Sequence, residues 1–216
     1  MLDPSIKAVL FDFDGTFGDT APDLVNAANY IFTKHHKDRL DFVSGRQIAS
    51  DGVKAFLNQR FDESEYDYKE LFDQFIDYYE QHSNDNFQLF DGIKKLIDYF
   101  DKNKILWGIV TNKSRRLTEK LLKLNDMYNR CSIIVCGDDG LKLKPCPDTL
   151  LHALKLLGIK NNEALYLGDG HRDIMAARNA NIKSILVTYG YLKQDDNYHS
   201  WGADFIINHP IELIKN

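Results

Sequence analysis

Short apolar runs, each followed by a helical pattern, recur along most of this chain. Most of the runs are continuously apolar, as expected for strands that are covered on both faces. Strands are predicted at Lys7–Phe11, Ile105–Val110, Ser132–Cys136, Ala164–Leu167, Ser184–Val187 and Phe205–Ile207. Helices are predicted at Gly92–Asp101, Ser114–Leu124, Thr149–Leu157 and Asp173–Ala180. This alternation predicts an α/β protein with a doubly wound, Rossmann-like parallel sheet.

Residues 18–88 interrupt the alternation, because they contain helical patterns and no good strand. Helices are expected from Pro22, which follows Thr20, and over Arg46–Arg60 and Tyr68–His82. We therefore expect an α/β core domain formed by residues 1–17 and 89–216, and an inserted small α-helical cap domain formed by residues 18–88. A cap that follows the first strand directly can close over a pocket and exclude water.

Composition narrows the class of protein. Hydrophobic residues make up 44% and charged residues 27% of the 216 positions, as in soluble globular proteins. The net charge of −5 and the lack of a basic stripe argue against nucleic acid and anionic membranes as partners. We see no signal peptide and no apolar run near the ~20 residues of a membrane span. The three cysteines lack zinc spacing and favour reduced thiols in a cytoplasmic protein.

Two carboxylates, Asp12 and Asp14, follow directly on the first predicted strand. The carboxyl ends of strands in an open parallel sheet are where ligands bind. The two acids repel each other unless a cation relieves them, and Mg²⁺, which prefers oxygen ligands, is the simplest cation. Gly15 permits a sharp turn after them, beside the hydroxyl of Thr16. The chemical interpretation makes Asp12 a nucleophile toward phosphorus and Asp14 an acid and base; the alternative is a pair of solvated turn acids.

A hydroxyl and an ammonium group are expected near the same edge of the sheet. Thr111 ends a strand before a helix, where its hydroxyl and the backbone N–H groups can bind a phosphoryl oxygen. Alternatively, Asn112 or Ser114 only caps that helix. Lys144 directly precedes Pro145, which restricts its backbone, and it would neutralise phosphoryl charge, or else is a surface lysine. We expect Lys113 to be a solvated surface charge, with a place in the pocket as the alternative.

Another pair of acids, Asp169 and Asp173, follows the strand predicted at Ala164–Leu167. Asp169 would complete a Mg²⁺ site, and Asp173 would orient it from close by or through water. The alternative is a helix N-terminus with acids that favour the helix dipole. His171 is expected to be a loop residue, because magnesium prefers oxygen ligands, and Arg172 to be solvated rather than in contact with a substrate.

The joint placement of these groups indicates more than each motif alone. Asp12, Thr111 and Asp169 each end an apolar run, and Lys144 lies in the loop region after another. Strands that end at one edge of a parallel sheet would bring these groups together. Acids, a hydroxyl, an ammonium group and a magnesium site are what phosphoryl transfer needs. A protein that uses this fold only for binding would be expected to have lost one of these acids or the lysine. All of them are present, so this alternative is disfavoured.

In their order along the chain, these motifs resemble those of the haloacid dehalogenase superfamily of phosphohydrolases. The motifs are Asp12-x-Asp14-Gly15-Thr16, Thr111-Asn112, Lys144-Pro145, and Gly168-Asp169 with Asp173. The helical insertion resembles the small α-helical cap of that superfamily. The resemblance therefore implies the same fold and a Mg²⁺-dependent phosphatase, because dehalogenases of the superfamily act without magnesium and an acid at position 14 indicates a phosphatase.

The resemblance also implies the role of each matching residue. Asp12 would form an aspartyl-phosphate, and Asp14 would protonate the leaving oxygen and then deprotonate the attacking water. The metal site would contain Asp12, the backbone carbonyl of Asp14, and Asp169, with Asp173 beside them. The phosphate site would contain Asp12, Gly15, Thr111, Asn112 and Lys144.

Within the superfamily the chain is similar to phosphoglycolate phosphatases, through Phe11–Thr16, Asp19–Asp23 and Lys144-Pro145-x-Pro147. The tail, with Tyr189-Gly190-Tyr191 and Trp201–Asp204, is similar to that of bacterial N-acetylmuramic acid 6-phosphate phosphatases. A sugar phosphomutase of the same superfamily is a further alternative. Phe17, Gly18 and Gly170 depart from the family pattern and touch hinge and loop shape more than chemistry.

The cap is expected to select the substrate, a small phosphorylated metabolite. Its stretch Ile48–Lys54 resembles the specificity loop of the family, so Ser50, Asp51, Gly52 and Lys54 are the candidate specificity residues. Arg46 or Lys54 would pair with the carboxylate of phosphoglycolate. Asp51 would repel that carboxylate and prefer sugar hydroxyls, or else it only caps the following helix. A monomer and a homodimer both remain open.

Overall fold

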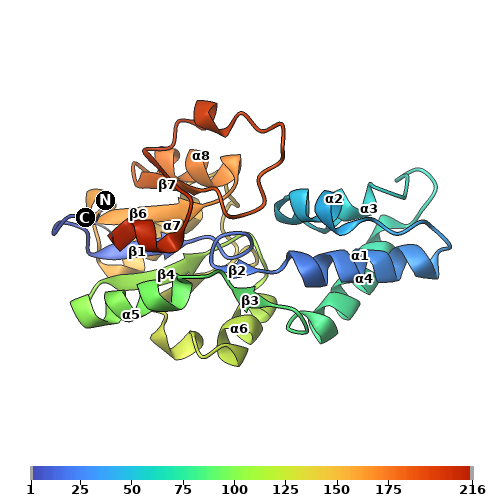
Figure 1. Ribbon diagram of the computed structural model, residues 1–216, viewed down its shortest axis with the longest axis horizontal. Coiled ribbons are helices and arrows are strands. Elements are labelled where there is room, and N and C mark those ends of the chain that lie inside the picture. The colour runs from blue at the N-terminus through green and yellow to red at the C-terminus, as the bar shows by residue number, and fades with distance from the viewer. Residues whose placement is uncertain (1, 215–216) are drawn as a thin grey trace.

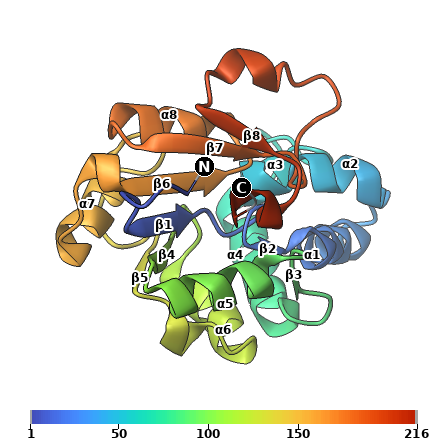
Figure 2. The same cartoon turned by 60° about the vertical axis from the view of Figure 1, so that its left-hand side comes forward.

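A six-stranded parallel sheet forms the centre of the computed structural model, which describes residues 2–214. The strand order is β5-β4-β1-β6-β7-β8, and every neighbouring pair is parallel (Figure 1 and Figure 2). The strands are β1 (Ala8–Phe11), β4 (Leu106–Val110), β5 (Ile133–Val135), β6 (Ala164–Gly168), β7 (Lys183–Val187) and β8 (Phe205–Ile207). The predicted doubly wound parallel sheet is therefore confirmed, with strand ends that differ by one residue at most.

Helices cover both faces of this sheet (Figure 2). They are α5 (Ile93–Asn103), α6 (Arg115–Leu124), α7 (Asp148–Leu157) and α8 (His171–Asn179). Side chains of β1 alternate between the faces. Val9 and Phe11 pack with α5 and α6, whereas Ala8 and Leu10 pack with α7 and α8. Burial of β1 on both faces explains why its sequence is continuously apolar.

A second group of helices lies beside the sheet (Figure 1). It contains α1 (Ala21–Lys34), α2 (Phe42–Gln47), α3 (Val53–Leu57) and α4 (Tyr68–His82), packed around a separate apolar core. The short antiparallel strands β2 (Gly18–Asp19) and β3 (Gln88–Leu89) pair where the chain leaves and rejoins the sheet. We call the helices α1–α4 with their connections the cap. The division of the chain into domains at residues 18–88 stays a prediction.

The predicted single helix over Arg46–Arg60 is wrong. The segment instead contains the end of α2, the short 3-10 turn η1 (Ala49–Asp51) and α3. Gly52 separates η1 from α3 with a φ of 84°, a left-handed value that an α-helix does not use. This break turns residues 49–52 into a loop, which faces the end of the sheet.

Short 3-10 turns and connections complete the chain. These turns are η2 (Tyr128–Arg130), η3 (Asn161–Glu163), η4 (Tyr198–Trp201) and η5 (Pro210–Ile214). Cys131, Cys136 and Cys146 are all free thiols, as predicted. Within residues 2–214, no helix has the length and apolar character needed to cross a membrane.

Candidate active site

The sheet brings the predicted polar residues to one edge. β1 lies between β4 and β6, so Asp12, Thr111 and Asp169, which follow the ends of these strands, become neighbours. All three are at least 95% buried. The structure therefore juxtaposes residues from positions far apart in the sequence, at the edge where parallel sheets bind ligands.

An acidic cluster forms the deepest part of the site. One carboxylate oxygen from each of Asp12, Asp169 and Asp173 lies within 4.8 Å of the others. Burial, together with the charges of Asp173 and Asp12, raises the pKa of Asp169 to about 7. Oδ1 of Asp169 is buried and has no hydrogen-bond partner among residues 2–214. A hard cation such as Mg²⁺ prefers carboxylate oxygens as ligands, and Oδ1 of Asp169 is free to bind one. The three acids therefore fit this ion.

Lys144 supplies the positive charge beside the cluster. Its Nζ lies 2.8 Å from Oδ1 of Asp12, 2.6 Å from Oδ1 of Asp173 and 2.8 Å from the hydroxyl of Tyr166. Burial alone would lower the pKa of Lys144, but the two carboxylates outweigh it and raise that pKa. The alternative of a surface lysine is therefore wrong.

The side chain of Asn112 holds the Lys144 backbone in place. Its Oδ1 accepts a hydrogen bond from the Lys144 N–H at 3.0 Å, and its Nδ2 donates to the Lys144 carbonyl at 3.2 Å. Both polar atoms of the amide are thus engaged by Lys144, and only the backbone of Asn112 is left for a phosphate. The hydroxyl of Thr111, its neighbour, accepts from the N–H of Lys113 at 3.2 Å.

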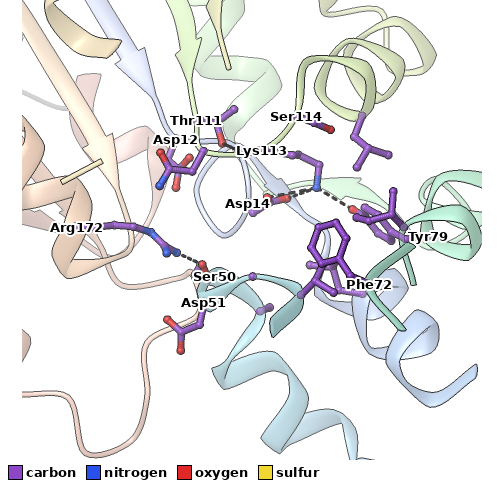
Figure 3. A pocket seen from close by; sticks show the side chains of 17 residues that line it. Asp12, Asp14, Ser50, Asp51, Phe72, Tyr79, Thr111, Lys113, Ser114 and Arg172 are labelled. Atoms are coloured by element: carbon purple, nitrogen blue, oxygen red, sulfur yellow. Dashed lines mark hydrogen bonds and ion pairs between the residues drawn. The ribbon is translucent and has the colours of Figure 1, made fainter. Parts of the chain in front are cut away.

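Asp14 faces the cap rather than the acidic cluster (Figure 3). Its Oδ1 accepts from Nζ of Lys113 at 2.9 Å and from the hydroxyl of Thr20 at 2.6 Å. Lys113 also donates to the hydroxyl of Tyr79 on α4, at 3.0 Å. The expectation that Lys113 is a solvated surface charge is wrong: its side chain is only 6% exposed, and it links Asp14 to the cap.

Gly15 lies against Asp169. A Cβ atom at this glycine would come within 2.1 Å of Oδ2 of Asp169, and the φ of Gly15 is 79°. The same oxygen accepts from the backbone N–H of Tyr191 at 2.9 Å. Gly15 thus allows the turn after Asp14 to approach the acidic cluster, which a larger residue would prevent.

Residues 49–52 of the cap, which we call the cap loop, contact the core next to the acidic cluster. The hydroxyl of Ser50 donates to Oδ2 of Asp169 at 3.1 Å, and the guanidinium of Arg172 donates to the carbonyl of Ser50 (Figure 3). Asp51 pairs with Lys193 at 2.8 Å. It also lines the pocket, the cavity that Asp12 and Asp14 border as well. The expectation that Arg172 is solvated is therefore wrong, because this side chain joins the core to the cap loop.

The structure does not place all of the other predicted cap residues in the pocket. α3 has no side-chain cap, so Asp51 does not cap the helix that follows it. Gly52 lines the pocket, whereas Lys54 pairs with Glu63 on the exposed surface of the cap and does not line the pocket. Arg46 forms two hydrogen bonds with Asp19, at 2.6 and 2.9 Å, and is likewise absent from the pocket wall.

Tyrosines are the main site residues that the sequence interpretation missed. Tyr166 joins Lys144, Tyr79 joins Lys113, and Tyr191 contacts Asp169 through its backbone. A polar tip within the otherwise apolar run Ala164–Leu167 was the available signal for Tyr166. Tyr79 carried no such signal, because aromatic residues at helical spacing are typical of a helix core.

These features together define a class of protein. A doubly wound parallel sheet with a buried lysine and a buried carboxylate cluster at its edge, next to a helical cap, is the arrangement of a phosphoryl-transfer enzyme. The sequence profile of the haloacid dehalogenase-like hydrolases matches residues 9–187. The chain therefore belongs to the haloacid dehalogenase-like hydrolase family, as the motifs predicted.

Relatives at the sequence level cover almost the whole chain. The N-acetylmuramic acid 6-phosphate phosphatase of Pseudomonas aeruginosa is 37% identical over 97% of this chain and 93% of its own length. The phosphoglycolate phosphatase of Xanthomonas campestris is 34% identical over 96% of this chain and 94% of its own.

Solved structures show the same fold. A hydrolase of the haloacid dehalogenase-like family from Streptococcus pneumoniae superposes with a TM-score of 0.85 at 22% identity, with 97% of each chain covered. A predicted phosphoglycolate phosphatase from Haemophilus somnus superposes with a TM-score of 0.87 at 21% identity, also with 97% of each chain covered. At these identities the likeness concerns the fold alone.

Proposed function

We propose that this protein is a Mg²⁺-dependent phosphatase that hydrolyses a small phosphate monoester through an aspartyl-phosphate. The observation that carries the proposal is the surroundings of Asp12, whose carboxylate lies at the sheet edge between Lys144 and the acids Asp169 and Asp173. Asp173 also pairs with Lys144, but it is further engaged by Tyr166 and the Gly170 N–H, and of the three acids Asp12 is the one that lines the cavity and so can meet a substrate.

The residues account for both halves of the reaction. A carboxylate oxygen of Asp12 forms a bond to phosphorus, while the ester oxygen departs with a proton from Asp14. Water, deprotonated by Asp14, then attacks phosphorus, which releases phosphate and restores the Asp12 carboxylate. Lys144 and the hydroxyl and backbone of Thr111 bind the phosphoryl oxygens throughout.

The acidic cluster would hold the metal. Asp12 and Asp169 supply carboxylate oxygens, the backbone carbonyl of Asp14 a further oxygen, and Asp173 lies beside them with its charge shared by Lys144. When bound, Mg²⁺ neutralises negative charge on the phosphoryl group. Asp169, with its unpartnered oxygen, is the residue most dependent on the ion.

Substitution of the proposed nucleophile tests the function. Asp12→Asn removes the charge and nucleophilicity with little change in shape, and we expect phosphate release from an aryl phosphate to fall by roughly 10⁴-fold or more. Asp195→Asn, at an exposed position, is the matched control and keeps full activity. An Asp12→Asn protein as active as this control would refute the assignment.

Two esters are the candidate substrates. Phosphoglycolate is favoured by the family motifs and by relatives that carry that name. N-Acetylmuramic acid 6-phosphate is favoured by the similarity of the whole chain, tail included, to the P. aeruginosa and Pseudomonas putida enzymes, at 37% and 33% identity. The cytoplasmic location, the lack of nucleic-acid and membrane partners, and the monomeric or homodimeric state stay predictions from the sequence.

A further inference from the structure

The site opens into a cavity of about 390 Å³, large enough for a small-molecule ligand. The reacting residues Asp12, Asp14 and Thr111 line one part of it. Another part of its lining is apolar and comes mainly from the cap: Leu24, Ala49, Val53, Phe72, Ile76 and the core residue Leu117. We call these six residues the apolar wall. The proposed phosphoryl transfer uses none of them.

Phe72 is the member of the apolar wall that the fold itself explains least, whereas Ile76 packs against the edge of the cap core. They are four residues apart on α4 and so share one face of the helix. Their neighbours Leu71 and Phe75 are at most 2% exposed and form the cap core, whereas Phe72 is 44% exposed. An exposed aromatic ring on the wall of a cavity, beside the buried Tyr79 (Figure 3), is a surface that a ligand can cover.

The charges around the cavity do not suit a small carboxylate. Of the cationic side chains in its described lining, Lys113 is engaged by Asp14 and Tyr79, and Arg172 donates to Ser50. The nearby carboxylates of Asp173, Asp12 and Asp169 offset part of the Arg172 charge. On the cap side, Asp51 is paired with Lys193 at 2.8 Å, so this part of the described lining offers a carboxylate no free cation.

We propose that the alcohol part of the substrate is of hexose size, with an apolar face that packs against Phe72 and Ile76 and hydroxyls that reach Ser50 and Asp51. This inference rests on the proposed phosphatase function and names its substrate class. The two-carbon glycolate part of phosphoglycolate would leave the apolar wall uncovered and bring its carboxylate toward Asp51. The C–H face of a sugar ring, in contrast, would bury the Phe72 ring and place hydroxyls where Asp51 accepts hydrogen bonds.

The test compares kcat/KM for esters that share the phosphate and differ in the alcohol. Phosphoglycolate, glycerol 3-phosphate, ribose 5-phosphate, glucose 6-phosphate and N-acetylglucosamine 6-phosphate form such a series. We expect kcat/KM to rise along the series and to be at least about 30-fold higher for a hexose phosphate than for phosphoglycolate. A preference for phosphoglycolate would overturn the inference while leaving the phosphatase function intact.

Variants locate the effect on the apolar wall. We expect Phe72→Ala to lower kcat/KM for the hexose phosphates by roughly 10-fold, mainly through KM, and to change it less than about 2-fold for phosphoglycolate. Phe42→Ala, which removes a ring that is 47% exposed on α2 and outside the cavity, is the matched control and changes neither value. An equal loss for every ester in Phe72→Ala would contradict a role in substrate selection.

Failure of the proposed function has its own signature. If the unaltered protein, with Mg²⁺ and a folded circular dichroism spectrum, releases phosphate from no ester of the series, from no aryl phosphate and not from N-acetylmuramic acid 6-phosphate, the phosphatase proposal itself fails and the substrate inference fails with it. Phosphate release that favours small esters, by contrast, refutes only the packing on Phe72 and Ile76.

Discussion

The acidic cluster and the apolar wall share a cavity but are built in opposite ways. Asp12, Asp173 and Lys144 are at least 95% buried and are fixed by mutual ion pairs shorter than 3 Å. The wall has few polar contacts, and Phe72 remains 44% exposed. The first region is held by its own ion pairs, whereas Phe72 in the second region becomes buried only when a ligand covers it.

The difference teaches how the two tasks are divided. Stabilising a charged transition state requires groups that are fixed in advance. Burying such charged groups costs free energy, and the fold tolerates this cost where the charges pair. Selecting an alcohol requires a matching shape and apolar contact, which cap side chains in the cavity wall can supply. Changes in the acidic cluster should therefore affect both turnover and stability, and changes in the cap should affect mainly the choice of substrate.

Removing Lys144 is the largest expected effect after loss of the nucleophile. Lys144→Met leaves Asp12 and Asp173 buried without their cation, so kcat should fall by about 10³-fold and the free energy of unfolding by about 3 kcal/mol. Steady-state kinetics and urea denaturation measure the two quantities. Lys142→Met, two residues away and exposed, serves as the control and should alter neither. A stable Lys144→Met protein with normal turnover would erase the contrast between the two regions.

Mg²⁺ should stabilise the folded protein through Asp169. At 100 times its dissociation constant the ion adds about 2.7 kcal/mol, which corresponds to a rise in Tm of roughly 5–10 °C. Burial raises the pKa of Asp169 from 3.8 to about 7, so the metal-free protein loses stability as the pH rises between these values, and Mg²⁺ restores it. Calorimetry should therefore show a larger rise at pH 8 than at pH 6. The same rise in Asp169→Asn would mean that the ion binds elsewhere.

Lys113 joins the two regions, and its loss should have an intermediate effect. Lys113→Met removes the cation that positions Asp14, and we expect kcat to fall by roughly 10- to 100-fold. Tyr79→Phe removes only the contact with the cap and should lower kcat by about 3-fold or less. Steady-state kinetics with one ester compare the two variants. If Tyr79→Phe lowered kcat as much as Lys113→Met does, the cap rather than the core lysine would position Asp14.

The smallest effect is expected at the exposed ion pair between Asp51 and Lys193. Both side chains are more than 40% exposed, and such pairs contribute about 0–1 kcal/mol. Lys193→Ala should therefore change kcat/KM by less than about 5-fold for any ester. A loss of about 100-fold or more for one ester would show that this contact, and not the apolar wall, controls the choice of substrate.

The same contrast explains what the sequence can predict. The apolar strands and the acids that end them are local patterns, and the chain order of Asp12, Thr111, Lys144 and Asp169 implies a shared sheet edge. The sequence alone is therefore sufficient to predict these positions. The break at Gly52 was missed, because a single glycine in a helical pattern does not show its φ.

Other features depend on the tertiary structure and left no local signal. A lysine in a turn is usually solvated, so the sequence gives no sign that Lys113 is buried. Its burial follows from the packing of α4 against the turn between β4 and α6. The exposure of Phe72 beside the buried Phe75 is likewise a property of the assembled cap. Lys54 was assigned to the pocket by its place in the specificity loop, yet the register of α3 turns it toward Glu63.

The central claim is that Asp12 becomes phosphorylated, and trapping the intermediate tests it most directly. Asp14→Asn should slow hydrolysis of the aspartyl-phosphate, while an aryl phosphate, whose leaving group needs no proton, still forms it. Borohydride reduces an acyl phosphate to an alcohol, so peptide mass spectrometry should then find homoserine at position 12. Steady phosphate release with Asp12 unmodified, or homoserine at another aspartate, would contradict the account.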